Sequence, residues 1–254
     1  MSEIIDFHIH PLHDWQFGDR VVKIDLSDWR KELEAFGIRR ACGSVIYRAM
    51  EGRPVSEYEQ LVPQLNNKAR ECREEMGEFY LPGIHVHPAF VEMSCAEIDK
   101  AYQDGIRLVG ELVPYMMGWR AYASPEMLEI FSFAAEKGMV VSLHPTYYDD
   151  MDALATALPH LNIVYAHLSG KEEQLALMMK HDNVYYDFCA HGGDREGMLR
   201  YSIDRVGVDR ILFGTDFPGG DVVSDLEAAL SGGLTSEELE AVLGSNARRL
   251  LGLN

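Results

Sequence analysis

The segment Ile4-Ile5-Asp6-Phe7-His8-Ile9-His10-Pro11 joins an apolar run to two histidines spaced two residues apart. Its apolar and β-branched residues predict a β-strand over residues 4–9. Successive side chains of a strand point to opposite faces, so His8 and His10 are expected to share one face. An open, doubly wound nucleotide-binding sheet usually has a glycine-rich phosphate loop after its first strand, and this segment contains no glycine. The segment therefore favours a parallel architecture other than the doubly wound nucleotide-binding sheet.

Seven more short apolar runs follow the first, and amphipathic segments lie between them. Most of the runs lack strict polar alternation, which is typical of strands that are buried on both faces. Strands that alternate with helices predict a parallel sheet, and 254 residues is close to the ~250 typical of one barrel. We therefore predict an α/β fold, a single (β/α)₈ TIM barrel domain over residues 1–254. The predicted strands are 4–9, 41–46, 79–86, 108–113, 140–143, 163–166, 184–188 and 211–214, and the predicted helices are 28–36, 56–76, 125–137, 172–180, 193–206, 224–230, 236–243 and 246–251.

The composition narrows the classes of partner. A formal net charge of −18 argues against nucleic acid and against an anionic membrane surface as the main partner. The four cysteines show no CxxC spacing, which is typical of a reduced, intracellular protein. The N-terminus lacks the pattern of a signal peptide, and no stretch approaches the ~20 apolar residues of a membrane span. We expect a cytoplasmic protein that acts on a small molecule.

Four more metal-competent side chains lie within or at the end of predicted strands, namely Glu111, His144, His167 and Asp216. Each has an ordinary interpretation when taken alone. A histidine at a strand end is usually a satisfied polar group, an aspartate after a strand is often a helix cap, and Glu111 could pair with an arginine. In a barrel, however, the C-terminal strand ends converge on one face, where active sites are found. We therefore predict that these residues share a metal site with His8 and His10.

The ordered motifs of the chain resemble those of the amidohydrolase-related branch of the amidohydrolase superfamily. That branch includes both hydrolases and decarboxylases of the aminocarboxymuconate-semialdehyde type. The resemblance extends over essentially the whole chain. It rests on Asp6-Phe7-His8-Ile9-His10, Ser142-Leu143-His144-Pro145, Ala166-His167-Leu168-Ser169-Gly170, Phe213-Gly214-Thr215-Asp216-Phe217-Pro218 and Asn246-Ala247-Arg248-Arg249-Leu250-Leu251-Gly252.

The resemblance implies a set of ligands and a metal-dependent activity. His8, His10, His144 and Asp216 match the family's metal positions, and His167 matches a histidine that binds a second metal or polarises the reacting group. Gly110-Glu111 is similar to the Gly-Glu of TatD-like nucleases and phosphotriesterase-like relatives, in which a carboxylate bridges two metals. One or two divalent ions are therefore expected. Zn²⁺ is the first expectation, although histidine and carboxylate ligands also suit Mn²⁺, Fe²⁺ and Co²⁺.

The expected reaction is hydrolysis of an amide, ester or lactone of a small carboxylated or cyclic substrate. A bound divalent ion supplies hydroxide at neutral pH, Asp216 acts as general base and then acid, and His167 stabilises the oxyanion. The alternative is a non-oxidative decarboxylase on the same scaffold. A TatD-like phosphodiesterase or nuclease fits the acidic composition less well, and a non-catalytic metal-binding protein has no support in the sequence. A homodimer is the expected assembly, because it is the commonest one and fits the family.

Three residues are candidates for substrate binding. Arg48 and Arg120 follow the second and fourth strands, where a guanidinium can hold a substrate carboxylate through two hydrogen bonds. A surface salt bridge is the favoured ordinary interpretation of each of them. His85 and His87 form a second His-x-His pair on the third strand, and His87 is the better candidate for contact with substrate. Four aromatic residues expected in the strand-end loops are candidates for the lining of the pocket, namely Tyr115, Trp119, Tyr147 and Tyr148.

Overall fold

Eight parallel strands form the centre of the computed structural model, which describes residues 3–12, 14–17, 20–23, 25–46, 50–189 and 197–253. Each strand pairs with the next along the chain, in the order β1-β4-β5-β6-β7-β8-β9-β10. All eight predicted strands are confirmed, with ends shifted by a few residues. Their bounds are β1 Ile4–Asp6, β4 Ile38–Ser44, β5 Tyr80–Ile84, β6 Leu108–Leu112, β7 Val140–Leu143, β8 Ile163–Tyr165, β9 Val184–Phe188 and β10 Ile211–Phe213.

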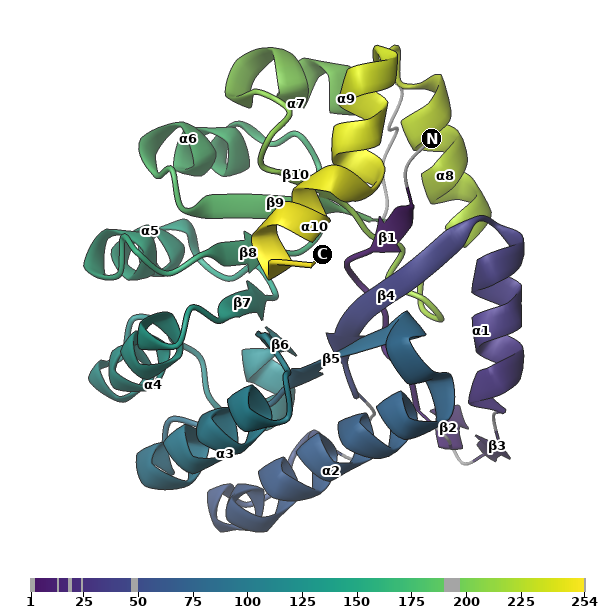
Figure 1. Ribbon diagram of the computed structural model, residues 1–254. Helices are drawn as coiled ribbons and strands as arrows, with labels where there is room; N and C mark the ends of the chain where they lie inside the picture. Colours follow the sequence, from purple (N-terminus) through teal and green to yellow (C-terminus); the bar gives the residue numbers. More distant parts are fainter. Residues whose placement is uncertain are drawn as a thin grey trace.

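The sheet closes into a barrel where β1 meets β10. The backbone N–H of Phe7 donates to the carbonyl of Phe213 at 2.8 Å, and the N–H of Asp216 donates to the carbonyl of His8 at 2.7 Å. Ile9 and Phe217 form a further parallel bridge along this junction. Figure 1 shows the strands around the centre with the helices outside them. The predicted TIM barrel is confirmed, and its closing junction contains two of the predicted ligands.

Helices follow the strands, as the amphipathic segments predict. Asp25 caps α1 and Ser124 caps α4, because each side chain accepts hydrogen bonds from backbone N–H groups of the first turn. The predicted segment 193–206 contains α7, and its first four residues lie outside the described residues. The bounds are α1 Leu26–Ala35, α2 Tyr58–Met76, α3 Val91–Gln103, α4 Pro125–Glu136, α5 Tyr148–Ala157, α6 Glu172–Lys180, α7 Met198–Val206, α8 Val222–Ser231, α9 Ser236–Glu240 and α10 Asn246–Leu251.

Two helices and one pair of strands were not predicted from the sequence. Helices α3 and α5 begin after Phe90 and Tyr147, whose side chains make no capping hydrogen bond, so the usual start signal is missing. Tyr148, expected in a strand-end loop, is the first residue of α5. An antiparallel pair, β2 (Asp14–Phe17) and β3 (Arg20–Lys23), lies outside the barrel. Its signal was present in the sequence, because Gly18-Asp19 between two apolar runs is typical of a hairpin.

The N-terminal end of the barrel is closed by the C-terminal helix. Ala247 and Leu251 of α10 belong to a buried cluster with strand residues such as Leu108, Val140 and Val164. Figure 1 shows α10 lying across this end. The opposite, C-terminal end is therefore the one where side chains can meet a ligand. No helix among the described residues is both long and apolar enough to cross a membrane.

Candidate metal centre

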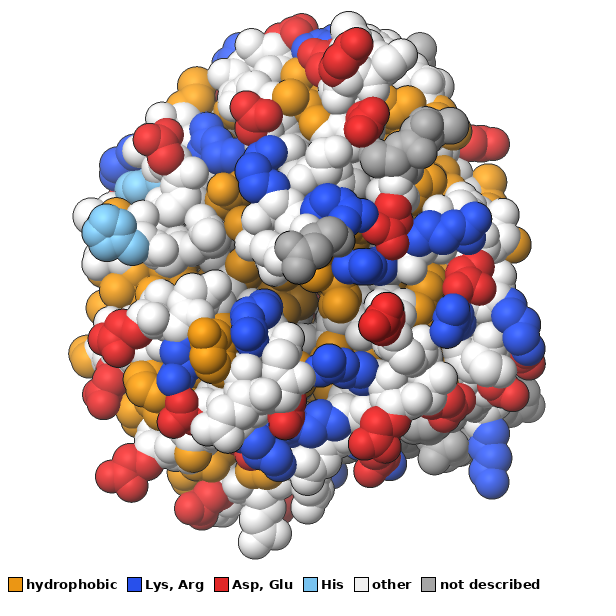
Figure 2. All heavy atoms as spheres, viewed as in Figure 1, with side chains coloured by type: hydrophobic (Ala, Val, Ile, Leu, Met, Phe, Trp, Pro, Cys, Tyr) orange, Lys and Arg blue, Asp and Glu red, His pale blue; other side chains and the backbone are white. Residues whose placement is uncertain are grey.

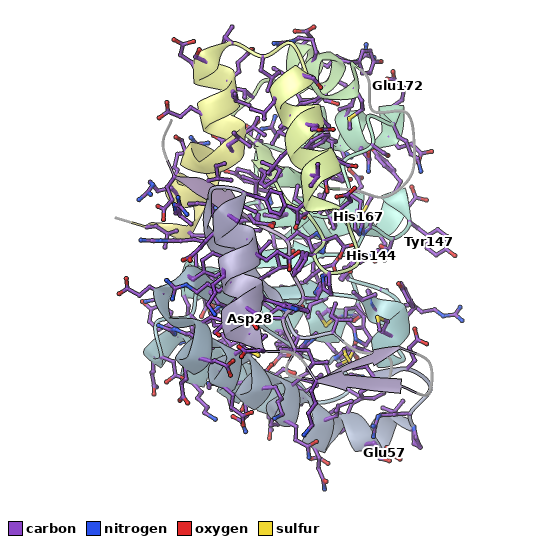
Figure 3. The ribbon with its side chains drawn as sticks, turned by 90° about the vertical axis from the view of Figure 1, so that its right-hand side faces the viewer. Asp28, Glu57, His144, Tyr147, His167 and Glu172 are labelled. Atoms are coloured by element: carbon purple, nitrogen blue, oxygen red, sulfur yellow. The ribbon has the colours of Figure 1, made fainter. Side chains whose placement is uncertain are left out.

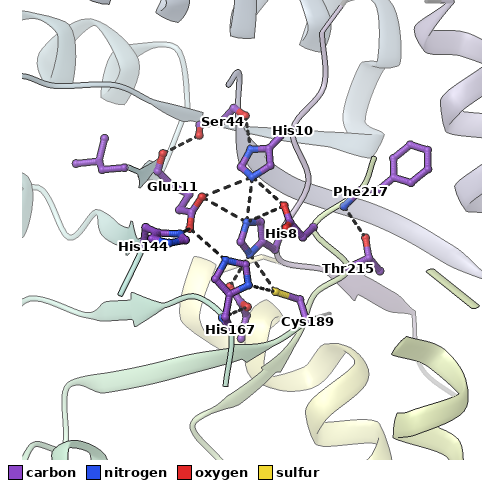
Figure 4. A network of polar contacts seen from close by, with 12 residues as sticks. His8, His10, Ser44, Glu111, His144, His167, Cys189, Thr215 and Phe217 are labelled. Carbon is purple, nitrogen blue, oxygen red and sulfur yellow. Dashed lines mark hydrogen bonds and ion pairs between the residues drawn. The ribbon is translucent and has the colours of Figure 1, made fainter. Parts of the chain in front are cut away.

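Side chains from the segment after β1, from β6 and from the loop after β10 meet at the C-terminal end of the barrel. His8 Nε2 and His10 Nε2 lie 3.1 Å apart, and each lies 3.5 Å from Glu111 Oε2. Asp216 Oδ1 lies 3.6 Å from His8 Nε2 and 3.2 Å from His10 Nε2. Figure 4 shows these contacts at close range. We call His8, His10, Glu111 and Asp216 the four-residue cluster.

The spacing of these atoms fits the ligand shell of a divalent metal. Ligands bound at about 2.1 Å lie about 3.0 Å apart in an octahedral shell and about 3.4 Å apart in a tetrahedral one. The distances between the nitrogen and oxygen atoms of the cluster are close to these two values. Two imidazole nitrogens and two carboxylate oxygens are also donors that bind divalent transition metals. The residues present therefore fit the ion that the sequence predicts.

Hydrogen bonds behind the two histidines fix the direction of their lone pairs. His10 Nδ1 lies 2.9 Å from the carbonyl oxygen of Ser44, and His8 Nδ1 lies 3.0 Å from Oδ2 of Asp187. Each acceptor requires a proton on Nδ1, so Nε2, which faces the cluster, is the nitrogen left to bind a metal. Metal-binding histidines usually have such a partner on their second nitrogen. This pattern is strong support for a ligand role.

Glu111 is buried between two groups of nitrogen donors. Its Oε2 atom faces His8 and His10, while its Oε1 atom lies 3.1 Å from His144 Nδ1 and 4.0 Å from His167 Nε2. His8, His10 and Glu111 form one possible metal-binding group, and Glu111, His144 and His167 form another. Glu111 is thus placed where a carboxylate can join two ions. His144, expected to be a ligand together with His8 and His10, lies on the other side of this carboxylate.

Burial and neighbouring charges shift the pKa values in the cluster in opposite directions. Burial raises the pKa of Glu111 and of Asp216, but the adjacent histidines more than reverse this effect and leave both values well below the ordinary range. Burial lowers the pKa of His8, but Asp187 and other acidic neighbours raise it above its ordinary value. Burial and the neighbouring His8 lower the pKa of His167 to about 4, so its imidazole is neutral at pH 7.

Two residues of the site hold the left-handed backbone conformation that L-residues seldom adopt. His167 has φ of 63° and Asp216 has φ of 56°. Such a conformation costs on the order of 1–3 kcal/mol and persists where the surrounding structure imposes it. The backbone N–H of His167 donates to Oδ1 of Asp187 at 3.0 Å, which helps to hold that turn. Backbone strain is therefore concentrated at two predicted catalytic residues.

Asp187 and Cys189 are site residues that the sequence analysis missed. Asp187 is fully buried in β9 and accepts hydrogen bonds from both His8 and His167. Cys189 Sγ lies 3.0 Å from His167 Nδ1 and 3.4 Å from His8 Nδ1. An ionisable residue in the apolar run Val184-Tyr185-Tyr186-Asp187-Phe188 is the same signal that identified Glu111. A search of every predicted strand for an ionisable residue within an apolar run would therefore have identified Asp187.

The candidate substrate residues lie in different surroundings. His87 is buried, with Nε2 3.0 Å from the carbonyl of Met117 and its ring stacked on Tyr58, so its observed contacts are with the protein interior. Arg120 is exposed, and no contact with the four-residue cluster is seen among the described residues. Arg48 lies outside the described residues. The substrate roles of all three stay predictions.

An exposed aromatic side chain lies beside the site. The ring of Tyr115 meets the ring of His144 edge to face, with centroids 5.7 Å apart, and its side chain is 64% exposed. Tyr147 lies at the outer edge of the same end of the barrel, with His144 and His167 deeper, as Figure 3 shows. Tyr115 is therefore placed to contact a ligand of the metal centre.

Comparison with known families and proteins agrees with this geometry. The sequence profile of the family described as Amidohydrolase matches residues 5–253. No curated protein sequence matches the chain at a significant level.

Solved structures show the same fold over the whole chain. The 2,6-dihydroxybenzoate decarboxylase from Rhizobium is 17% identical, with a TM-score of 0.76 and coverage of 100% of this chain and 99% of the other. A dihydroxybenzoic acid decarboxylase from Polaromonas sp. JS666, solved with manganese and the inhibitor 2-nitroresorcinol, is 14% identical, with a TM-score of 0.76 and coverage of 100% and 98%. The 5-carboxyvanillate decarboxylase from Sphingomonas paucimobilis is 12% identical, with a TM-score of 0.74 and full coverage of both chains.

Proposed function

This chain belongs to the amidohydrolase family, and we propose that it is a metal-dependent, non-oxidative decarboxylase of a small aromatic or unsaturated carboxylic acid. The observation that carries the proposal is the four-residue cluster, in which two histidine nitrogens and two carboxylate oxygens lie at ligand spacing. Its placement at the C-terminal end of a barrel similar throughout to three decarboxylase structures adds support.

The proposed reaction needs a group that orients the carboxylate and a group that delivers a proton. A bound divalent ion would hold the substrate and stabilise the negative charge that develops on it. The bond to the carboxylate breaks, CO₂ leaves, and the electron pair stays on the substrate carbon, which then takes up a proton. Asp216, whose ionised carboxylate lies beside both ligand histidines, is our candidate for relaying that proton: it would first take up a proton from an acidic group of the substrate or from water and then pass it to the carbon. His167, with a neutral imidazole, is our candidate for a hydrogen bond to a substrate oxygen.

This proposal reverses the order of the expectations drawn from the sequence. Hydrolysis was expected first and decarboxylation second, but the three compared structures are decarboxylases. The groups of possible ligands fit a divalent ion. Zinc is no longer favoured over manganese, because the Polaromonas structure contains manganese. Hydrolysis of a lactone is the second candidate. It is favoured by Glu111, whose two oxygens face two groups of nitrogen donors, as a carboxylate between two ions would.

Release of CO₂ separates the two candidates. Purified protein loaded with manganese, and separately with zinc, is mixed with dihydroxybenzoates, muconate-type acids and lactones, and both CO₂ and ring opening are followed. We expect CO₂ from at least one acid, matched mole for mole by the decarboxylated product and lost in His8→Ala. Lactone hydrolysis without CO₂ from any acid would establish the second candidate instead.

A further inference from the structure

The opposite end of the barrel, far from the metal centre, contains a recess rich in arginine. A cavity of about 670 Å³ is lined by Arg40 of β4 and by Arg70 and Arg73 of α2. Figure 2 shows this face, where basic side chains gather around the middle with acidic side chains between them. The cavity lies at the end of the barrel that α10 covers, so it is separate from the proposed catalytic site.

A smaller, apolar cavity of about 50 Å³ adjoins the first one and shares Arg73 and Leu81 with it. Its other walls include Leu108, Leu251 and Leu253, from the start of β6 and the C-terminal end of the chain. The combined recess therefore offers guanidinium groups on one side and a small apolar crevice on the other.

The arginines of the recess retain unused donors. Arg70 Nε donates to Asp104 at 2.7 Å, but its Nη2 atom is buried without a hydrogen-bond partner in the described part of the chain. Arg73 Nη1 donates to the backbone carbonyl of Asp104 at 2.8 Å, a contact that leaves its charge unneutralised. Arg40 is paired through Nε with Glu3 at 3.2 Å. The guanidinium of Arg73, which bonds to a backbone carbonyl, therefore keeps donors for charge-assisted hydrogen bonds to an oxyanion.

Acidic residues also line the recess, and they limit its selectivity. Asp104 already accepts from Arg70, whereas Glu74 and Glu78 are exposed. Four arginines and three acidic residues line the combined recess, and Glu97 and Glu3 also pair with Arg70 and Arg40. Among the described residues, Arg73 and Arg107 are the two of these arginines that pair with no carboxylate. Such a site suits a single oxyanion group better than a polyanion.

We propose that this recess binds a small organic anion. Its oxyanion group, a carboxylate or a phosphate, lies against Arg40, Arg70 and Arg73, and a short apolar body enters the crevice at Leu81 and Leu253. The proposal is independent of the catalytic function, because the two sites lie at opposite ends of the barrel.

Titration calorimetry on the metal-loaded protein tests the proposal with hexyl phosphate, hexanoate and inorganic phosphate. We expect at least one hexyl compound to bind in the millimolar range or tighter, and more tightly than inorganic phosphate. Comparing the phosphate with the carboxylate identifies the preferred group. The double variant Arg40→Gln/Arg73→Gln should weaken binding at least about tenfold, since it removes charge-assisted hydrogen bonds. Arg39→Gln, an exposed neighbour on the same strand, should leave binding within about twofold.

Two further variants distinguish binding in the recess from binding at the metal centre. Leu253→Glu places a negative charge in the crevice without altering an arginine, and it should also weaken binding of the hexyl compounds. His8→Ala removes a ligand of the metal centre and should leave this binding intact. The proposal is overturned if no compound binds at millimolar concentration, if the double variant binds as tightly as wild type, or if His8→Ala alone abolishes binding.

Discussion

The Oδ2 atom of Asp187 lies 3.0 Å from Nδ1 of His8, and both side chains are buried. The other carboxylate oxygen, Oδ1, accepts a hydrogen bond from the backbone N–H of His167. One carboxylate on β9 thus orients a proposed metal ligand and holds the turn of a proposed catalytic residue. This relationship links the geometry of the seventh barrel strand to that of the first and the sixth.

Replacing Asp187 with asparagine should weaken metal binding about 10–100-fold, the usual effect of losing a partner of a ligand histidine. The amide can accept only one of the two hydrogen bonds, and its NH₂ group then faces an N–H donor. Competition with a chromogenic chelator measures the affinity. Asp152→Asn is the control, because Asp152 also contacts a histidine, His181, but at the surface between α5 and α6. Equal metal affinity in Asp187→Asn and wild type would refute the role of Asp187.

Gly214 packs against His8, and there is no room for a side chain at position 214. A Cβ atom at position 214 would lie 2.8 Å from the Cβ atom of His8, closer than such atoms approach in proteins. Gly214→Ala should therefore displace His8, reduce metal occupancy and destabilise the fold by roughly 1–3 kcal/mol, the range for overpacking. Gly219→Ala in the same loop is the control, since its nearest neighbour would be 3.3 Å away. Metal content and urea unfolding measure both effects, and full occupancy in Gly214→Ala would contradict this interpretation.

Much of the barrel and most of the cluster could be predicted from the sequence, for a definite physical reason. Strands buried on both faces are apolar runs, and an ionisable residue within such a run, such as Glu111, is conspicuous. Which side chains meet across the barrel could not be predicted, because that depends on strand tilt and stagger. The position of His144 on the far side of Glu111 is one example. His87 is a second example. It is spaced from His85 as His8 is from His10, yet it contacts Met117 and Tyr58 in the protein interior.

Tyr115 should contribute to substrate binding more than to the chemical step. Its exposed ring meets that of His144 edge to face, so an aromatic substrate at the metal centre would pack against it. Tyr115→Ala should raise KM about three- to tenfold, the change expected from losing the binding free energy of one aromatic contact. The value of kcat should change little. Tyr115→Phe keeps the ring and should restore KM, while Tyr102→Ala on α3 should have no effect. A large fall in kcat with unchanged KM would instead indicate a catalytic role.

Removing the metal should destabilise the protein. A ligand that binds only the folded state adds about 2.7 kcal/mol to the free energy of unfolding when it is present at 100 times its Kd. Thermal unfolding with EDTA and with excess manganese should therefore give midpoints that differ by several degrees. His8→Ala should show almost no difference between the two conditions. A midpoint in wild-type protein that does not respond to any divalent metal would argue against the four-residue cluster as a metal site.

The central claim is that the four-residue cluster binds a divalent ion, and anomalous X-ray scattering at the metal edge tests it most directly. We predict an anomalous peak within about 2.4 Å of His8 Nε2, His10 Nε2 and an oxygen of Asp216, with Glu111 next to it. A second peak near Glu111 Oε1 and His144 would show that Glu111 joins two ions. A metal-loaded crystal with no peak at the cluster, or with an ion bound only elsewhere, would contradict the account.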